Sequence, residues 1–85
     1  MARYKITIKK SAIKELENTP KKDLQRIVKR IGSLVWNPRP YGSQKLAAQN
    51  CFRIRAGDYR IVYSINDKDL AVDIIKIGHR REIYR

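Results

Sequence analysis

Three arginines flank an expected tight turn in the second half of the chain. Arg53 and Arg55 precede the Gly57-Asp58 pair, and Arg60 follows it. Each guanidinium group offers a planar fork of donors that fits a phosphate group. Because three such groups repel one another unless an anion lies among them, the cluster predicts a binding site for a phosphodiester. The alternative is a structural role in ion pairs with acidic residues, namely Asp58, Asp67 and Glu82.

Alternation of side chains places Arg53 and Arg55 on one face of a predicted strand, and it leaves open whether Arg60 on the next strand shares that face. Phe52 and Ile54 would face a core. Arg53 and Arg55, which alternate with them, would point the other way. A turn of two residues makes the two strands antiparallel neighbours. We therefore expect Arg55 and Arg60 to lie within cross-strand reach.

The C-terminal residues carry a second group of candidates, His79, Arg80 and Tyr84. Histidine is the side chain that most often exchanges protons near neutral pH, but a lone histidine at a strand end is more often structural. Tyr84 has two open interpretations. It either docks the C-terminus onto the domain, or it stacks on a base or donates its hydroxyl near a scissile bond.

The whole chain is strongly basic. Twenty Lys and Arg residues against 8 Asp and Glu give a net charge of +12 in 85 residues. A small domain usually carries a net charge of about 2–8 in magnitude. The excess predicts a polyanionic partner, either nucleic acid or an acidic protein.

Composition also excludes several classes of protein. One cysteine and one histidine rule out a disulfide framework and leave too few ligands for zinc. No stretch approaches the roughly 20 apolar residues that span a membrane, and the N-terminus lacks the apolar core of a signal peptide. We therefore expect a cytoplasmic protein with no metal, no cofactor and no membrane contact.

We expect these candidate residues to belong to one α+β domain that spans residues 1–85. A strand at 3–9 would lead into a hairpin of two helices. Ser11 is the expected N-cap of the first helix, and Thr19 that of the second. The hairpin would pack on an antiparallel sheet of about four strands, with the last three at 51–56, 59–65 and 70–77.

The second helix is expected to be amphipathic. Its apolar side has the regular helical spacing of Leu24, Ile27, Val28, Ile31 and Leu34. Its other side is basic and includes Lys22, Arg26 and Lys29. These cations either hold nucleic-acid phosphates or form an ordinary solvated face.

Three segments resemble the RelE/ParE superfamily of bacterial and archaeal toxins. They are Lys45-Leu46, the run CFRIRAGDYRIVY and the ending IIKIGHRREIYR. The similarity covers nearly the whole chain. The G-x-Y-R-I-V-Y element is shared across the superfamily and indicates the fold. The GHRREIYR ending is more specific and resembles the RelE branch, whose members cleave messenger RNA in the ribosomal A site.

The resemblance implies a role for each matching residue. Arg53 and Arg55 take the positions of two catalytic basic residues. Arg60 and Arg80 take phosphate-binding and leaving-group positions, and Tyr84 that of the tyrosine that orients the nucleotide. The best-known RelE enzyme has lysines in place of Arg53 and Arg55. Arginine stabilises an oxyanion well but is a poor general base.

The implied enzyme is a metal-independent endoribonuclease in which an RNA 2′-hydroxyl attacks the adjacent phosphate. Five further residues are expected to bind RNA, namely Lys45, His79, Lys22, Arg26 and Lys29. The implied partners are the ribosome with its messenger RNA and an acidic RelB-like antitoxin, with which the toxin can form a heterotetramer.

Two other functions stay open at this point. The first is inhibition of DNA gyrase, as in the ParE branch, whose members generally lack the basic tail with its tyrosine. The second is a catalytically inactive relative that binds nucleic acid, although no helix-turn-helix or aromatic platform supports it.

Overall fold

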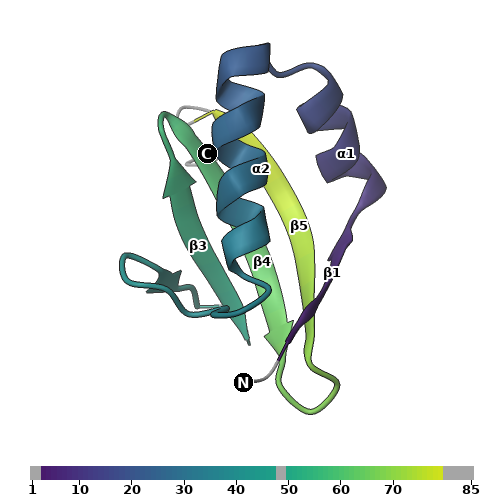
Figure 1. Cartoon of the computed structure of the whole chain (residues 1–85), viewed down its shortest axis with the longest axis vertical. Coiled ribbons are helices and arrows are strands. Elements are labelled where there is room, and N and C mark those ends of the chain that lie inside the picture. The colour runs from purple at the N-terminus through teal and green to yellow at the C-terminus, as the bar shows by residue number, and fades with distance from the viewer. Residues whose placement is uncertain (1–2, 48–49, 80–85) are drawn as a thin grey trace.

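The computed structural model describes residues 3–47 and 50–79. The protein is a five-stranded sheet with two helices on one face (Figure 1). The helices are α1 (Lys10–Glu17) and α2 (Lys21–Ser33). The strands are β1 (Lys5–Ile8), β2 (Gln44–Lys45), β3 (Cys51–Ala56), β4 (Tyr59–Asn66) and β5 (Ala71–His79). Neither described helix is long and apolar enough to cross a membrane.

The strands lie in the order β1-β5-β4-β3-β2. Short turns join β3, β4 and β5 into an antiparallel meander. The helical hairpin carries the chain from β1 at one edge of the sheet to β2 at the other edge (Figure 1). On the way, α1 packs against β5, and α2 packs against β3 and β4.

The expected α+β fold, with an N-terminal strand and a helical hairpin on a sheet, is confirmed. Two details differ from the expectation. The segment between α2 and β3 contains the two-residue strand β2, which pairs with Arg53 and Phe52 and brings the sheet to five strands. In addition, β1 runs parallel to β5, so the sheet is mixed rather than purely antiparallel.

One core lies between the helices and the sheet. Its fully buried aliphatic side chains come from both layers and include Ile27, Leu34, Ile54, Ile61 and Ile74. Each such side chain stabilises the fold by about 1.5–3 kcal/mol relative to leaving it exposed. The helical spacing also predicted a buried Val28, but this residue is 53% exposed because only one stripe of α2 meets the sheet.

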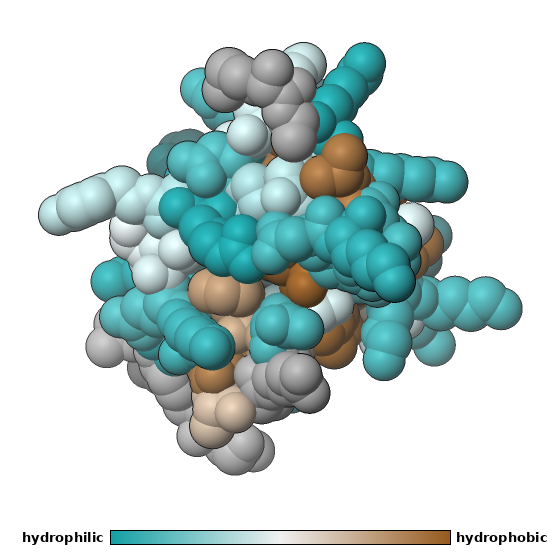
Figure 2. All heavy atoms as spheres, turned by 90° about the horizontal axis from the view of Figure 1, so that it is seen from below, coloured by the Kyte–Doolittle hydropathy of each residue, from teal (hydrophilic) through white to brown (hydrophobic). Residues whose placement is uncertain are grey.

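Hydrophilic side chains cover most of the surface seen from the lower end of the molecule, with apolar ones in small separate patches (Figure 2). Tyr41, at the turn before β2, is fully exposed. The surface on this side therefore suits water and charged partners better than an apolar one.

The helix caps differ from those predicted. The position before α1 is Lys9, and the position before α2 is Pro20, and neither has a side-chain cap. The amide of Lys9 still donates to Ile74 O of β5 (3.0 Å), so α1 begins directly at the sheet and Ser11 lies within it. The Thr19 hydroxyl donates to Glu15 O (2.6 Å) and closes α1 rather than opening α2.

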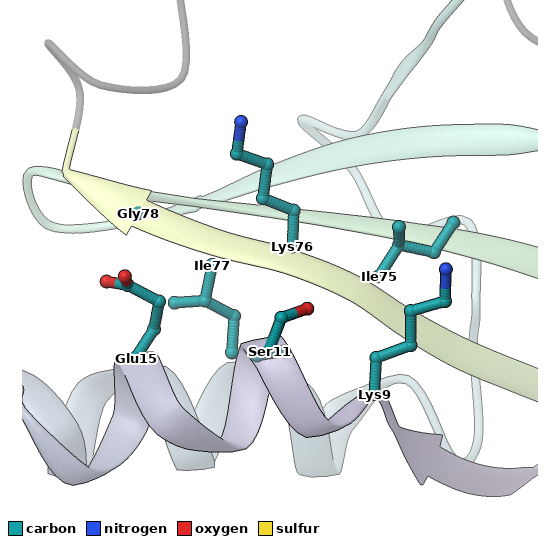
Figure 3. A pocket seen from close by; sticks show the side chains of 8 residues that line it. Lys9, Ser11, Glu15, Ile75, Lys76, Ile77 and Gly78 are labelled. Atoms are coloured by element: carbon teal, nitrogen blue, oxygen red, sulfur yellow. The ribbon is translucent and has the colours of Figure 1, made fainter.

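Strands β4 and β5 are paired through a β-bulge. Val62 lies opposite Lys76, and the next residue, Tyr63, lies opposite Ile74, which leaves Ile75 as the extra residue. In Figure 3, Ile75 and Lys76 both point away from α1. The bulge thus puts two successive residues on the face of the sheet that the helices leave open.

Two polar anchors hold the segment that follows α2. The buried Tyr63 hydroxyl donates to Pro38 O (2.7 Å), and burial raises the pKa of Tyr63 to about 12. At the lower end, Arg39 forms an ion pair with Asp67 (2.8 Å), which also accepts a hydrogen bond from the Tyr4 hydroxyl (2.8 Å). These contacts tie the long connection to the sheet on which β2 must pair.

Replacing Tyr63 by phenylalanine tests the first anchor. The change keeps the ring but leaves the buried Pro38 carbonyl without its donor, which should lower the free energy of unfolding by about 1–3 kcal/mol. Urea titration followed by circular dichroism measures this loss. The matched change Tyr41→Phe, at a fully exposed ring, should leave the stability unchanged. Equal stability of the two variants would contradict the role given to the Tyr63 hydroxyl.

The second anchor predicts a response to acid. Hydrogen bonds from Arg39 and Tyr4 hold the pKa of Asp67 at about 2, below its ordinary 3.8. A lowered folded-state pKa contributes stability above the ordinary value, and this contribution is lost as the pH falls from about 4 towards 2. Asp67→Asn should flatten the stability curve in that window. Asp58→Asn, at an exposed turn, should keep the wild-type slope, and identical slopes for both variants would refute the assignment.

Candidate nucleic-acid interface

The three arginines of β3 and β4 share the face of the sheet that points away from the helices. Arg55 lies directly opposite Arg60, and Arg53 lies opposite Val62 on the same face. The predicted cross-strand position of Arg55 and Arg60 is thus confirmed. We call this surface the arginine face; its residues are Arg53, Arg55, Arg60, Val62, Ser64 and Lys76.

The arginines differ in how far solvent reaches them. Arg55 is exposed, Arg53 is half-buried, and Arg60 is only 3% exposed. Arg53 and Arg60 are both engaged in interactions, as a buried guanidinium must be. A solute therefore meets Arg55 and the exposed Lys76 first, and it reaches Arg60 only if the groups that cover it move aside.

The structure adds three residues that sequence patterns did not single out. Lys76 joins the arginine face because it pairs with Val62. Gln44 of β2 lies opposite Arg53 and accepts a hydrogen bond from its guanidinium group, which fixes the direction of that side chain. Gly78 lies opposite Arg60, so no β5 side chain occupies the space beside it. Strand alternation in β5 would have put Lys76 on the core side with Val72 and Ile74, and only the bulge turns it to the arginine face.

Two predicted RNA-binding residues lie off this face. Lys45 pairs with Phe52, which packs against the core, so alternation turns Lys45 away from the arginines. His79 pairs with Tyr59, another residue of the core side, and the two rings meet edge to face at 5.5 Å. The half-buried His79 thus packs on an aromatic ring rather than facing a phosphate site.

The remaining candidates are divided between the helix layer and the chain end. Lys22, Arg26 and Lys29 are exposed on α2, on the other side of the sheet from the arginine face. Arg80 and Tyr84 lie outside the described residues. The described part of the chain therefore holds two separate basic surfaces, one on the sheet and one on α2.

A hollow of about 380 Å³ lies between α1 and β5, as Figure 3 shows. Ile77 points into it from β5, and Ser11 and Glu15 line it from α1. Lys9 and Glu15 give it opposite charges, which suits a polyanion poorly. Within residues 3–47 and 50–79, no three His, Cys, Asp or Glu side chains gather as metal ligands.

The chemistry open to the arginine face follows from its charge. The ionisable side chains that gather around Arg55 and Val62, namely Arg53, Arg55, Arg60 and Lys76, are cations with donor groups only. Such a surface can bind phosphate oxygens and stabilise negative charge that grows on them. None of these four cations readily takes up a proton, so proton transfer must come from outside them. Asp73 lies on the same side of the sheet, opposite Ser64, where its carboxylate accepts a hydrogen bond from the Thr7 hydroxyl.

Comparisons with known proteins agree with one another about the fold. The family described as "ParE toxin of type II toxin-antitoxin system, parDE" matches residues 6–84. Toxin RelE of Mycobacterium tuberculosis is 33% identical over 84 residues, which cover 96% of this chain and 87% of the relative. A chain of the archaeal RelE-RelB complex from Pyrococcus horikoshii OT3 superposes with a TM-score of 0.83 at 32% identity, over 92% of this chain and 96% of that one. A chain of the toxin-antitoxin complex RelBE2 from M. tuberculosis gives 0.80 at 27% identity, over 93% and 100%.

The arginine face should bind single-stranded nucleic acid mainly through charge. The double change Arg55→Ala/Lys76→Ala should lower the slope of log affinity against log salt by about 1.4, since each phosphate contact contributes about 0.7 for a single strand. Fluorescence anisotropy with a labelled oligothymidylate measures this slope. The control Lys14→Ala/Lys68→Ala removes the same charge elsewhere and should leave the slope unchanged. If both double variants lose the same slope, binding depends on net charge alone.

Proposed function

This chain belongs to the RelE/ParE superfamily as a RelE-family toxin of a type II toxin–antitoxin system, and from that premise we propose that it cleaves messenger RNA on the ribosome. The observation that carries the proposal is the arginine face, where Arg55 and Arg60 stand opposite each other with Arg53 beside them. Three guanidinium groups on one face match the several oxygens of a phosphodiester.

In the proposed reaction the 2′-oxygen of a nucleotide attacks the adjacent phosphorus atom, and the bond from phosphorus to the 5′-oxygen of the next nucleotide breaks. The products are a 2′,3′-cyclic phosphate and a 5′-hydroxyl end. The reaction is metal-independent in this proposal because the arginines offset the charge that grows on the phosphoryl oxygens. The leaving oxygen takes up a proton as the 2′-hydroxyl loses one.

Proton transfer is the step for which the arginines are least suited, since their guanidinium groups stay protonated. We assign alignment of the reacting groups to the ribosome, which holds the message in place and makes the attack intramolecular and in line. Arg80 and Tyr84 supply the leaving-group contact and orient the nucleotide in this proposal. Free RNA should accordingly be cut poorly.

The proposal includes an antitoxin and a cellular location. The P. horikoshii structure is a complex of RelE with RelB, and the M. tuberculosis structure is the toxin-antitoxin complex RelBE2. A chain of net charge +12 is electrostatically complementary to an acidic partner. We assign this chain a RelB-like acidic antitoxin, with a heterotetramer as the assembly. The ribosomal target places the toxin in the cytoplasm.

Substitution of the arginines tests the chemistry. Arg60→Ala and Arg80→Ala should each slow single-turnover cleavage on the ribosome by about 10²–10³, the usual loss for one donor to a developing oxyanion. Primer extension on the message measures the cleavage. Ribosome affinity should change far less, because many phosphate contacts share it.

Arg55→Lys is a conservative substitution at an exposed site, to be compared with the two alanine substitutions. It keeps the charge but loses the bidentate fork, so its cleavage rate should fall only partly. Lys14→Ala, at an exposed position of α1, is the control and should cleave at the wild-type rate. Wild-type cleavage by Arg60→Ala and Arg80→Ala together would defeat the nuclease proposal.

Gyrase inhibition is the second candidate, because the matching family is described as ParE toxin. Members of the ParE branch poison DNA gyrase. A translation reaction containing the toxin should produce truncated message if it is a ribonuclease. A supercoiling reaction with purified gyrase should be inhibited instead if it acts as ParE does.

A further inference from the structure

A second hollow, of about 390 Å³, lies between α2 and the turn that joins β3 to β4. Its described lining residues are Arg26, Lys29, Arg30, Ser33, Arg55, Ala56 and Gly57. Three of these seven are basic residues of α2, a fourth basic residue, Arg55, also belongs to the arginine face, and none is acidic. The hollow lies on the helix side of the sheet, next to the part of β3 that does not pair with β2.

Two contacts shape the rim of this hollow. The Nε atom of Arg30 donates to Arg55 O (3.1 Å), which ties α2 to the end of β3 and holds the Arg30 guanidinium at the rim. Gly57 has a φ of 63°, and a Cβ atom there would lie 3.3 Å from Nη1 of Arg26. Glycine thus permits both the turn and the close approach of Arg26. The rim therefore consists of cations, of which Arg30 is held by the backbone of β3 and Arg26 lies close to its turn.

The hollow has an apolar floor beneath this cationic rim. Ala56 is 5% exposed, and the aliphatic stems of Arg26 and Lys29 add methylene groups at the sides. A phosphodiester backbone has few apolar groups that could pack against such a floor. An acidic peptide that also carries apolar side chains matches both parts, since its carboxylates meet the rim while a neighbouring apolar group covers the alanine.

We propose that this hollow docks an acidic segment of the antitoxin, with a carboxylate against Arg26, Lys29 and Arg30 and an apolar side chain on Ala56. The inference rests on the antitoxin partnership in the proposed function, but not on the nuclease activity. It reassigns Arg26 and Lys29 from RNA to the protein partner. The antitoxin would then hold the toxin on the helix side of the sheet, at a surface that shares only Arg55 with the arginine face.

Three probes test this assignment on the whole toxin. The first is the capped peptide Glu-Leu-Glu-Glu-Leu-Glu, the second replaces both leucines by serine, and the third is a short oligothymidylate. The Nε–H signals of Arg26 and Arg30 in NMR spectra report on the rim, and that of Arg39, held by Asp67, is the remote reference. The leucine peptide should shift the two rim signals and leave the reference in place, and it should bind more tightly than the serine peptide.

A matched pair of variants separates the hollow from general charge. Arg26→Gln/Lys29→Gln should weaken binding of the leucine peptide about tenfold or more, as expected for lost hydrogen bonds between charged groups. Lys14→Gln/Lys68→Gln removes the same charge from exposed sites elsewhere and should change the affinity less than about threefold.

Three outcomes would overturn the proposal. Rim shifts caused by the oligothymidylate but not by the leucine peptide would assign the hollow to nucleic acid. Equal affinity for the leucine and serine peptides would show that the apolar floor does not contribute to binding. Equal losses of affinity in both variant pairs would show that binding depends on net charge alone. None of these measurements involves RNA cleavage, so failure here and failure of the proposed nuclease activity are distinguished.

Discussion

Both helices pack on the same face of the sheet, and this one-sided burial decides where every charged residue of β3 and β4 can go. A guanidinium group among Ile54, Ile61 and the helix side chains would lose its hydration without compensation. Alternation therefore sends Arg53, Arg55 and Arg60 to the other face. The candidate site is thus a direct consequence of how the core is built, and the tight turn at Gly57 sets the strands in register so that two arginines meet.

Much of this arrangement could be predicted from local patterns. Alternation in β3 and β4 and the short turn between them were enough to place Arg55 within cross-strand reach of Arg60, because both features depend on neighbours in the chain. The pairing of Gln44 with Arg53 was not predictable, since a two-residue strand has no periodicity. The burial of Arg60 and the parallel direction of β1 depend on contacts between distant segments. Such contacts cannot be recognised from the residue pattern of a short stretch of sequence.

Basic residues gather both on the arginine face and on α2, with the sheet between them. A single extended polyanion would have to pass around the β3–β4 turn to contact both surfaces. Two partners, one for each surface, explain the division more simply, and the two surfaces differ in build. The arginine face carries donors in register on a rigid ladder, whereas the α2 surface surrounds an apolar floor. The net charge of the chain does not distinguish these two surfaces.

The β-bulge of β5 bears on how this strand can vary in length. Val72 and Ile74 face the core before Ile75, and Ile77 faces it afterwards, so the buried positions change from even to odd numbers at one residue. Removing Ile75 would join the two halves into an ordinary ladder, and Lys76 would still point outward. A relative could therefore gain or lose a single codon at this point while each side chain kept its side of the sheet, so alignments of this superfamily should tolerate a one-residue gap inside a central strand, where gaps are otherwise rare.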